Sequence, residues 1–346
     1  MKVIQLITAC LIMSGAPLFS SSAAAKGAGI PFESAEMLSA FGERPAFSPD
    51  GSRVAFIGKS YGDVYEIDLA TGNVRNLTNS FPHQGFLRVH YLHNGDYLLI
   101  GPRRNTGAQS RIKVDLYVLD RSLLRGLWPL EQSVFEGVAI GPHDEIAWQQ
   151  IPAGSILDKG ETWLQASQRL PLETYVGRIE YDRGKPRLKA ARRIAPGPEG
   201  CRGEVQDFRR NGTELVLTCG GSDGAGRFMG IFGHDLTRDE PTTFHKARDR
   251  DYAEVEGVAP DGSWAAVECG RREGAEVVPL LDICRLELVP DGKLSPLIVG
   301  TAPGSTRKVS NPVISPDAKS VAFQVGDAAI GDIGEGGGVY LMRIAD

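Results

Sequence analysis

The sequence has no large excess of either charge and no long apolar segment after its N-terminal residues. Its 346 residues contain 38 Lys and Arg against 43 Asp and Glu, a net charge of −5. Because it has no basic tail or arm, we expect no nucleic-acid partner. After residue 25, no stretch approaches the roughly 18 apolar residues that a membrane-spanning helix needs. We therefore expect a protein that is at most peripheral to a membrane.

Cysteines are scarce, and they are not spaced as metal ligands. Five are present, and Cys10 lies in the apolar N-terminal segment. The sequence has no C-x-x-C and no nearby histidine pair, which argues against zinc. An even number of the others in an exported chain favours disulfides. One pair lies symmetrically about the turn at residues 209–212, and the other brackets a loop. We predict the disulfides Cys201–Cys219 and Cys269–Cys284.

The N-terminal segment is typical of a secretory signal peptide. Lys2 is its basic residue, Val3–Phe19 is largely apolar, and Ser22–Ala25 offers small residues for cleavage. We predict that residues 1–25 are a signal peptide and that residues 26–346 form a single domain. The protein is therefore expected to be periplasmic or secreted.

The rest of the chain repeats a tight turn followed by an apolar strand. In Ser48–Gly51, Pro49 presets φ at the second turn position and Gly51 accepts a positive φ. Six turns of this kind are centred on Asp50, Asn94, Asp144, Asn211, Asp261 and Asp317. Their spacings of 44, 50, 67, 50 and 56 residues lie mostly near the period of about 40–50 residues of a four-stranded blade. We predict an all-β fold, a six-bladed β-propeller with four-stranded antiparallel blades.

Two strands of each blade can be placed from the apolar runs. The strands that follow the turns are predicted at Val54–Ile57, Tyr97–Ile100, Ile146–Gln150, Leu215–Thr218, Trp264–Glu268 and Val321–Val325. The next strands are predicted at Val64–Leu69, Asp115–Leu119, Tyr175–Tyr181, Gly230–Asp235, Ile283–Leu288 and Val339–Ile344. The longest interval contains an insertion, Pro152–Pro171, with a short helix that is either a lid over the channel or a plain excursion.

The last repeat stops after its third strand, so the sixth blade lacks an outer strand. We predict that Ser34–Phe41 supplies this strand and closes the ring, because closure removes an exposed sheet edge. The alternative is that this segment is a linker after the signal peptide.

The first repeat contains Ser-Pro-Asp-Gly-x-x-Val-Ala-Phe, followed by Asp-Val-Tyr-Glu-Ile-Asp-Leu-Ala-Thr-Gly-Asn-Val-Arg-Asn-Leu-Thr. It resembles the TolB-like six-bladed β-propeller repeat, and residues 310–344 are similar to it again. The resemblance implies a ring over the whole mature chain. TolB itself carries an additional N-terminal α/β domain, and too few residues precede Asp50 to build one here. The resemblance therefore implies the fold and not the partner.

One catalytic motif is matched by spacing alone. Gly58–Gly62 fits G-x-S-x-G, but a nucleophile elbow needs a helix after it, and the predicted strand Val64–Leu69 follows instead. We interpret the segment as a hairpin turn and Ser60 as no nucleophile. We expect no cofactor.

The first strand of each propeller blade lines the central channel. Counting back five to eight residues from each turn selects the ring Arg44, Arg88, Glu136, Glu204, Glu256 and Asn311. Such a ring can bind a polar ligand or hold water. Arg103 and Arg271 are expected in loops at the same mouth, where guanidinium groups suit carboxylates or phosphates, including acidic sugars. The alternative is solvated surface charge.

Three histidines cluster in the second blade. His83 is a candidate general base beside the channel mouth, because a histidine pKa suits that role. His90 and His93 are separated by an odd number of residues, so a regular strand would send them to opposite faces. We therefore expect no metal shared among them.

These features favour an exported binding module that is non-catalytic and holds a polysaccharide, peptide or cell-envelope partner at the channel mouth. We expect it to be a monomer. The alternative is a propeller enzyme, a lyase or hydrolase of an acidic glycan that uses His83 and a charged residue of the ring. A third hypothesis is a scaffold without a small ligand.

Overall fold

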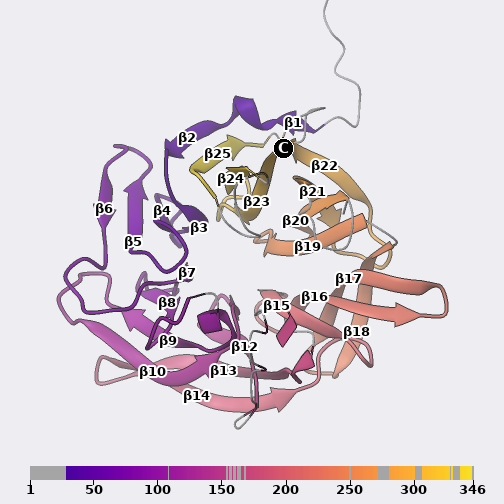
Figure 1. The fold of residues 1–346 in the computed structure, drawn as a ribbon, viewed down its shortest axis with the longest axis horizontal. Helices are drawn as coiled ribbons and strands as arrows, with labels where there is room; N and C mark the ends of the chain where they lie inside the picture. Colours follow the sequence, from indigo (N-terminus) through magenta and orange to yellow (C-terminus); the bar gives the residue numbers. More distant parts are fainter. Residues whose placement is uncertain are drawn as a thin grey trace, which may run out of the picture.

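The computed structural model describes residues 29–107, 109–152, 155, 158, 161, 165–166, 169–248, 251–271, 280–300, 306–327, 329 and 336–344. Within these residues, six β-sheets lie around a central axis like the blades of a propeller (Figure 1). The predicted signal peptide and most of the predicted insertion at Pro152–Pro171 lie outside the described residues.

Each sheet is formed in chain order, from the centre of the ring to its edge. Sheet one contains β3 (Glu43–Phe47), β4 (Arg53–Ile57), β5 (Val64–Asp68) and β6 (Val74–Asn76). Sheet two contains β7 (Arg88–Tyr91), β8 (Tyr97–Gly101), β9 (Val114–Leu119) and β10 (Leu127–Val134). Sheet three contains β11 (Val138–Ile140), β12 (Glu145–Gln150), β13 (Glu173–Asp182) and β14 (Lys185–Ile194). Sheet four contains β15 (Arg202–Arg209), β16 (Glu214–Asp223), β17 (Gly226–Asp235) and β18 (Glu240–Arg248). Sheet five contains β19 (Asp251–Val258), β20 (Trp264–Arg271), β21 (Leu280–Glu287) and β22 (Leu294–Val299). Sheet six contains β23 (Arg307–Ile314), β24 (Ser320–Asp327) and β25 (Val339–Arg343). The six-bladed antiparallel fold and the strands predicted from the apolar runs are confirmed.

The N-terminal residues add strands to the last two sheets. β1 (Ile30–Pro31) pairs in parallel with β22, and the 3-10 helix η1 (Phe32–Ser34) follows it. β2 (Glu36–Ser39), which lies within the segment predicted to supply an outer strand, pairs antiparallel with β25. β2 is the fourth strand of the sixth sheet (Figure 1).

The apolar core lies between neighbouring sheets. Leu98 of sheet two packs in one cluster with Trp148 and Ile179 of sheet three, and other clusters fill other gaps between blades. Because a blade is covered on both faces, the middle of its second strand is a continuous apolar run rather than an alternating one. All five residues of β8 are buried, for example. The continuous apolar runs in the sequence therefore reflect the stacking of blades in a ring.

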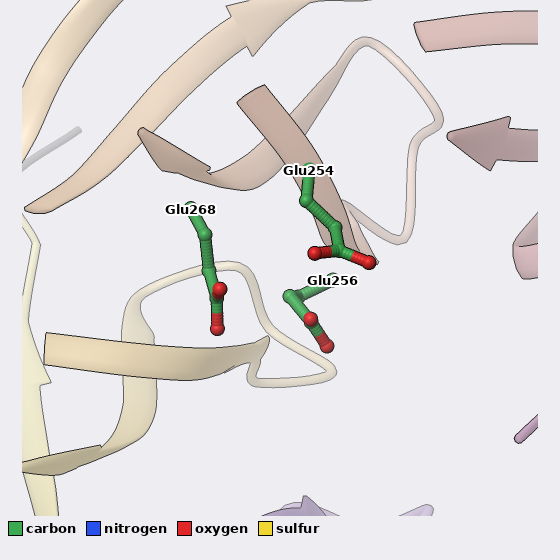
Figure 2. Close-up of side chains that lie close together, drawn as sticks. All are labelled: Glu254, Glu256 and Glu268. Carbon is green, nitrogen blue, oxygen red and sulfur yellow. The ribbon is translucent and has the colours of Figure 1, made fainter. Parts of the chain in front are cut away.

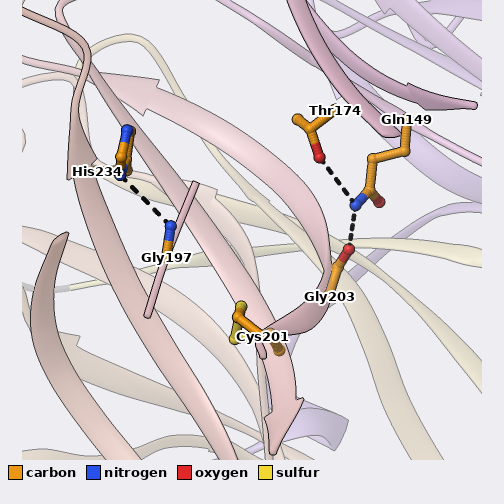
Figure 3. The surroundings of a disulfide bond; sticks show 7 residues. Gln149, Thr174, Gly197, Cys201, Gly203 and His234 are labelled. Atoms are coloured by element: carbon orange, nitrogen blue, oxygen red, sulfur yellow. Dashed lines mark hydrogen bonds between the residues drawn. A yellow bond between two sulfur atoms is a disulfide. The ribbon is translucent and has the colours of Figure 1, made fainter. Parts of the chain in front are cut away.

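Both predicted disulfides are present. Cys201–Cys219 links the residue before β15 to β16, and Cys269–Cys284 links β20 to β21, so each bond lies within one blade. Figure 3 shows the first bond beside Gly203, whose carbonyl accepts a hydrogen bond from Gln149 of the preceding blade. Disulfides form and persist in oxidising compartments. Among the described residues, no helix is long and apolar enough to cross a membrane.

Candidate functional site

The innermost strands of the six sheets surround a central cavity of about 150 Å³. Five of the six ring residues predicted from the turn spacing line it: Arg44, Arg88, Glu204, Glu256 and Asn311. The sixth, Glu136, directly precedes the cavity-lining Gly137, and its Oε1 lies 3.4 Å from Arg111 Nε. The structure therefore brings the predicted ring together, and ligand binding by it stays a prediction.

Four innermost strands carry one extra residue where they face the cavity. The pairing with the second strand shifts between Glu43 and Ala46, Val205 and Asp207, Val255 and Gly257, and Ser310 and Val313. These β-bulges contain the cavity-lining residues Arg44, Gln206, Glu256 and Asn311. A bulge bends its strand and re-aims a side chain. The same local device thus presents polar side chains from four blades to the cavity.

Two bulge residues also have an unusual backbone. Arg44 and Asn311 have φ values of 55° and 49°, in the left-handed region that side chains other than glycine adopt at a cost. Each is followed by a proline, Pro45 or Pro312, which has no N–H to donate and is tolerated at bulges. The surrounding contacts must hold this conformation.

At every junction of the ring, a hydrogen bond near the cavity joins two neighbouring blades. Two of these bonds hold the backbone N–H groups of Arg44 and Asn311. In order around the ring the bonds are Arg44 Nη1 to Leu87 O (2.9 Å), Glu136 N to Arg111 O (3.1 Å), Gln149 Nε2 to Gly203 O, Val255 N to Thr218 Oγ1 (2.9 Å), Asn311 N to Glu268 Oε1 (2.7 Å) and Arg44 N to Gln324 Oε1 (2.7 Å). The N–H groups of the strained residues Arg44 and Asn311 are therefore both satisfied by the preceding blade.

The charged groups around the cavity interact as one set, in which carboxyls outnumber cations. Arg88 lies between two glutamates, with Nη2 3.9 Å from Glu204 Oε1 and Nη1 3.8 Å from Glu256 Oε2. Among the residues that line the cavity, the three carboxyl groups of Glu204, Asp207 and Glu256 accompany the two arginines Arg44 and Arg88.

Burial and this imbalance shift the pKa values of the channel groups. Burial, with the charge of Glu136, raises the pKa of Glu204 to about 8. Burial and the neighbouring carboxylates raise the pKa of Glu254 and of Glu268 to about 7. Burial opposes the charge of Arg88, yet Glu256, Glu204 and Glu136 hold its pKa above the usual range. The arginine is thus charged, while several glutamates hold protons near neutral pH.

Glu254, Glu256 and Glu268 form the densest part of this set (Figure 2). One carboxylate oxygen from each lies within 4.8 Å of the other two. Gln206 Nε2 donates to Glu254 Oε1 over 3.2 Å, and the Tyr252 hydroxyl donates to Glu254 Oε2. Sequence counting selected only Glu256. The i, i+2 spacing of Glu254 and Glu256 on one strand was the available signal.

The histidine that faces the cavity is His90 rather than His83. His83 Nε2 lies 2.9 Å from Asp63 Oδ1, and Gly85 N donates to its Nδ1 over 2.9 Å. Both ring nitrogens of His83 are therefore occupied, and the ring does not line the cavity. His90 lines the cavity, and burial together with Arg88 lowers its pKa to about 3. His90 is thus neutral at physiological pH.

The two loop arginines lie away from the cavity. Arg103 Nε donates to Asp115 Oδ2 over 3.0 Å and Nη2 donates to Glu131 Oε2 over 2.7 Å. Arg271 is the exposed last residue of β20. Neither residue lines the central cavity. Asp207 lines the cavity, and burial raises its pKa to about 7. The count back from the turns did not select this residue.

No protein-family model matches the sequence, and no curated protein matches it. Solved structures match it through the fold. TolB from Acinetobacter baumannii aligns with a TM-score of 0.51 and 14% identity over 78% of this chain. The fold is a TolB-like six-bladed β-propeller. The chain spans 56% of the length of that TolB chain.

Other structures similar to this TolB-like propeller have different functions. An oligogalacturonate lyase in complex with manganese has a TM-score of 0.56 at 12% identity, covering 92% of this chain and 98% of the lyase. A calcium-binding regucalcin from Agrobacterium tumefaciens has a TM-score of 0.51 at 14% identity, covering 92% and 96% of the two chains. At such identities the likeness shows the fold alone.

Proposed function

We propose that this protein is an exported, non-catalytic binding module that holds a polar group of a cell-envelope polysaccharide or peptide in its central cavity. The observation that carries the proposal is a set of polar atoms around the cavity that have no hydrogen-bond partner among the described residues. They are Arg44 Nε, Arg88 Nε, His90 Nε2 and Asn311 Oδ1. Buried polar atoms are costly to leave unpaired, so a ligand group that pairs with them gains affinity. The two disulfides support an oxidising location.

The size of the cavity limits what enters it. Its volume of about 150 Å³ is below the roughly 300–1,000 Å³ of pockets that hold a drug-sized ligand. One sugar substituent or a chain end fits this space, and the rest of a polymer would lie across the mouth. The proposal is therefore recognition of an end or a protruding group, not of a long threaded segment.

The charge of the walls selects the kind of group. Carboxyls exceed arginines among the residues that line the cavity, and Arg88 is flanked by Glu204 and Glu256. Amines and hydroxyls can donate to these carboxylates, whereas an added carboxylate would meet repulsion. We therefore expect an amine-bearing or hydroxyl-rich group to bind better than an acidic one.

The alternative of a lyase or hydrolase acting on acidic glycans is supported by the likeness to an oligogalacturonate lyase. Its candidate base, His83, has both ring nitrogens occupied and lies outside the cavity lining. The binding hypothesis needs no such base and uses the residues that do line the cavity.

Isothermal titration calorimetry of the purified mature protein tests the proposal. The panel contains glucosamine oligomers with free amines, their N-acetylated forms, short peptides and oligogalacturonates. We expect the free amines to bind best. We expect Glu204→Gln to weaken their binding about tenfold, because the Glu204 carboxyl can ionise when an ammonium group binds beside it and a glutamine amide cannot. Binding of oligogalacturonate alone, or a new ultraviolet absorbance from a double bond, would contradict the proposal. So would no binding across the whole panel.

A further inference from the structure

Glu254, Glu256 and Glu268 form a glutamate cluster on β19 and β20. Glu254 and Glu256 project from β19 and Glu268 projects from β20, with one oxygen of each within 4.8 Å of the others (Figure 2). The arginine that approaches closest in an ion pair, Arg88, has its Nη1 3.8 Å from Glu256 Oε2. That distance is too long for a hydrogen bond. The three carboxyls therefore face one another across a short gap.

The separations in the cluster match a single large divalent ion. Ca²⁺ is bound by oxygens at about 2.3–2.6 Å, so oxygens on opposite sides of one ion lie about 4.6–5.2 Å apart. Three oxygens within 4.8 Å of one another leave a central point no more than about 2.8 Å from each, so shifts of a few tenths of an ångström bring all three to Ca²⁺ distance. Mg²⁺ takes its oxygens at about 2.0–2.1 Å and would require a tighter group.

The residue that donates to Glu268 carries a buried oxygen with no partner of its own. Asn311 Nδ2 donates to Glu268 Oε1 over 3.2 Å, which holds the side-chain amide against the glutamates. Asn311 Oδ1 is buried without a hydrogen-bond partner among the described residues, and the whole residue is only 7% exposed. Amide carbonyls are ordinary Ca²⁺ ligands. An ion would satisfy this orphaned acceptor.

The acid at position 268 is not needed for the fold. Glu268 Oε1 accepts the Asn311 N–H, just as Gln324 Oε1 accepts the Arg44 N–H at the next junction. A glutamine amide therefore serves the inter-blade hydrogen bond equally well. The carboxylate adds a charge beside two others, which destabilises a cluster without a counter-ion.

We propose that Glu254, Glu256, Glu268 and Asn311 form a Ca²⁺ site in the wall of the central channel. The ion would connect the fifth blade to the sixth through β19, β20 and β23. The proposed polysaccharide or peptide site also uses Asn311, so the two proposals are tested with separate probes.

Calorimetry with CaCl₂ alone tests the site. The mature protein is treated with EDTA, dialysed and titrated, and we expect one Ca²⁺ per chain together with a melting temperature that rises with CaCl₂ concentration. Glu268→Gln should keep the hydrogen bond to Asn311 and fold normally, yet weaken Ca²⁺ binding at least about tenfold. Glu204→Gln is the matched control, because it exchanges another buried channel carboxyl for an amide without removing a ligand oxygen. It should weaken binding much less.

A second readout uses Tb³⁺, which replaces Ca²⁺ and luminesces when a nearby tyrosine sensitises it. The Tyr252 hydroxyl donates to Glu254, so bound Tb³⁺ should luminesce on tyrosine excitation, and CaCl₂ should quench the signal. Glu254→Gln serves as a second variant if Glu268→Gln fails to fold. The proposal is overturned if CaCl₂ gives neither heat nor a rise in melting temperature, or if both ligand variants bind as tightly as Glu204→Gln. Because no glycan is present, either result leaves the ligand-panel outcome untouched.

Discussion

Gln324 is a buried side chain that joins the last blade of the ring to the first. Its Oε1 accepts the backbone N–H of Arg44 over 2.7 Å, and its exposed fraction is 0%. In Gln324→Ala, Arg44 keeps its left-handed backbone conformation, but its N–H loses the acceptor. An unpaired buried donor lowers the free energy of unfolding by about 1–3 kcal/mol. With the cavity left by the deleted side chain, the total loss should be about 2–4 kcal/mol.

Urea unfolding followed by circular dichroism measures this change in the free energy of unfolding. The melting temperature should fall by about 2 °C for each kcal/mol in a chain of this size. Thr71→Ala is the control, because Thr71 Oγ1 donates to Asp68 Oδ1 in an exposed turn. Its effect should stay within about 0.5 kcal/mol. If Gln324→Ala loses less than about 1 kcal/mol, or no more than Thr71→Ala, the inter-blade hydrogen bond does not stabilise the ring as argued here.

Three further results are expected. Replacing Cys201 and Cys219 together by serine should lower the free energy of unfolding by about 2–5 kcal/mol, and urea unfolding of the variant and the wild type without reductant checks it; equal stabilities would contradict it. Because burial raises the pKa of Asp207 to about 7 from a usual 3.8, the folded state keeps a proton that the unfolded chain loses. The stability that this group contributes is present below about pH 4 and is lost as pH rises toward 7. Urea unfolding at a series of pH values should show that Asp207→Asn makes the free energy of unfolding depend less on pH between about 4 and 7. An unchanged pH dependence would contradict the reasoning. Gly85→Ala should lower the melting temperature far more than Gly72→Ala. A Cβ at Gly85 would lie 2.0 Å from Tyr61 O, whereas one at Gly72 meets nothing within 4 Å and both residues have positive φ; equal shifts would refute the steric argument.

Much of the architecture follows from local sequence patterns. The turn at Ser48–Gly51 has a proline and a glycine at the positions that a tight turn demands, and its spacing to later copies matches one blade. The cysteines at 201 and 219 pair because the hairpin between them brings their strands together. The cavity-lining residues Arg44, Arg88, Glu204, Glu256 and Asn311 were found by counting five to eight residues back from each turn. All of these depend on contacts between residues close in the sequence.

The chemistry of the channel depends on contacts between blades. His83 was selected by its position in a loop, but the fold turns it toward Asp63 and presents His90 to the cavity. Glu268 meets Asn311 only because β20 and β23 lie on neighbouring blades. Bulges at Glu256 and Asn311 re-aim their side chains, and no period-two alternation predicts that.

The amino-acid sequence by itself determined the number of blades, the strand pattern and the disulfide pairing, because turns and hairpins are set by residues a few positions apart. The tertiary structure alone decided which charged side chains share the channel and which of them lack a partner. Those relations arise when the ring places strands from distant repeats side by side, and the resulting burial, rather than the residue type, sets their pKa values.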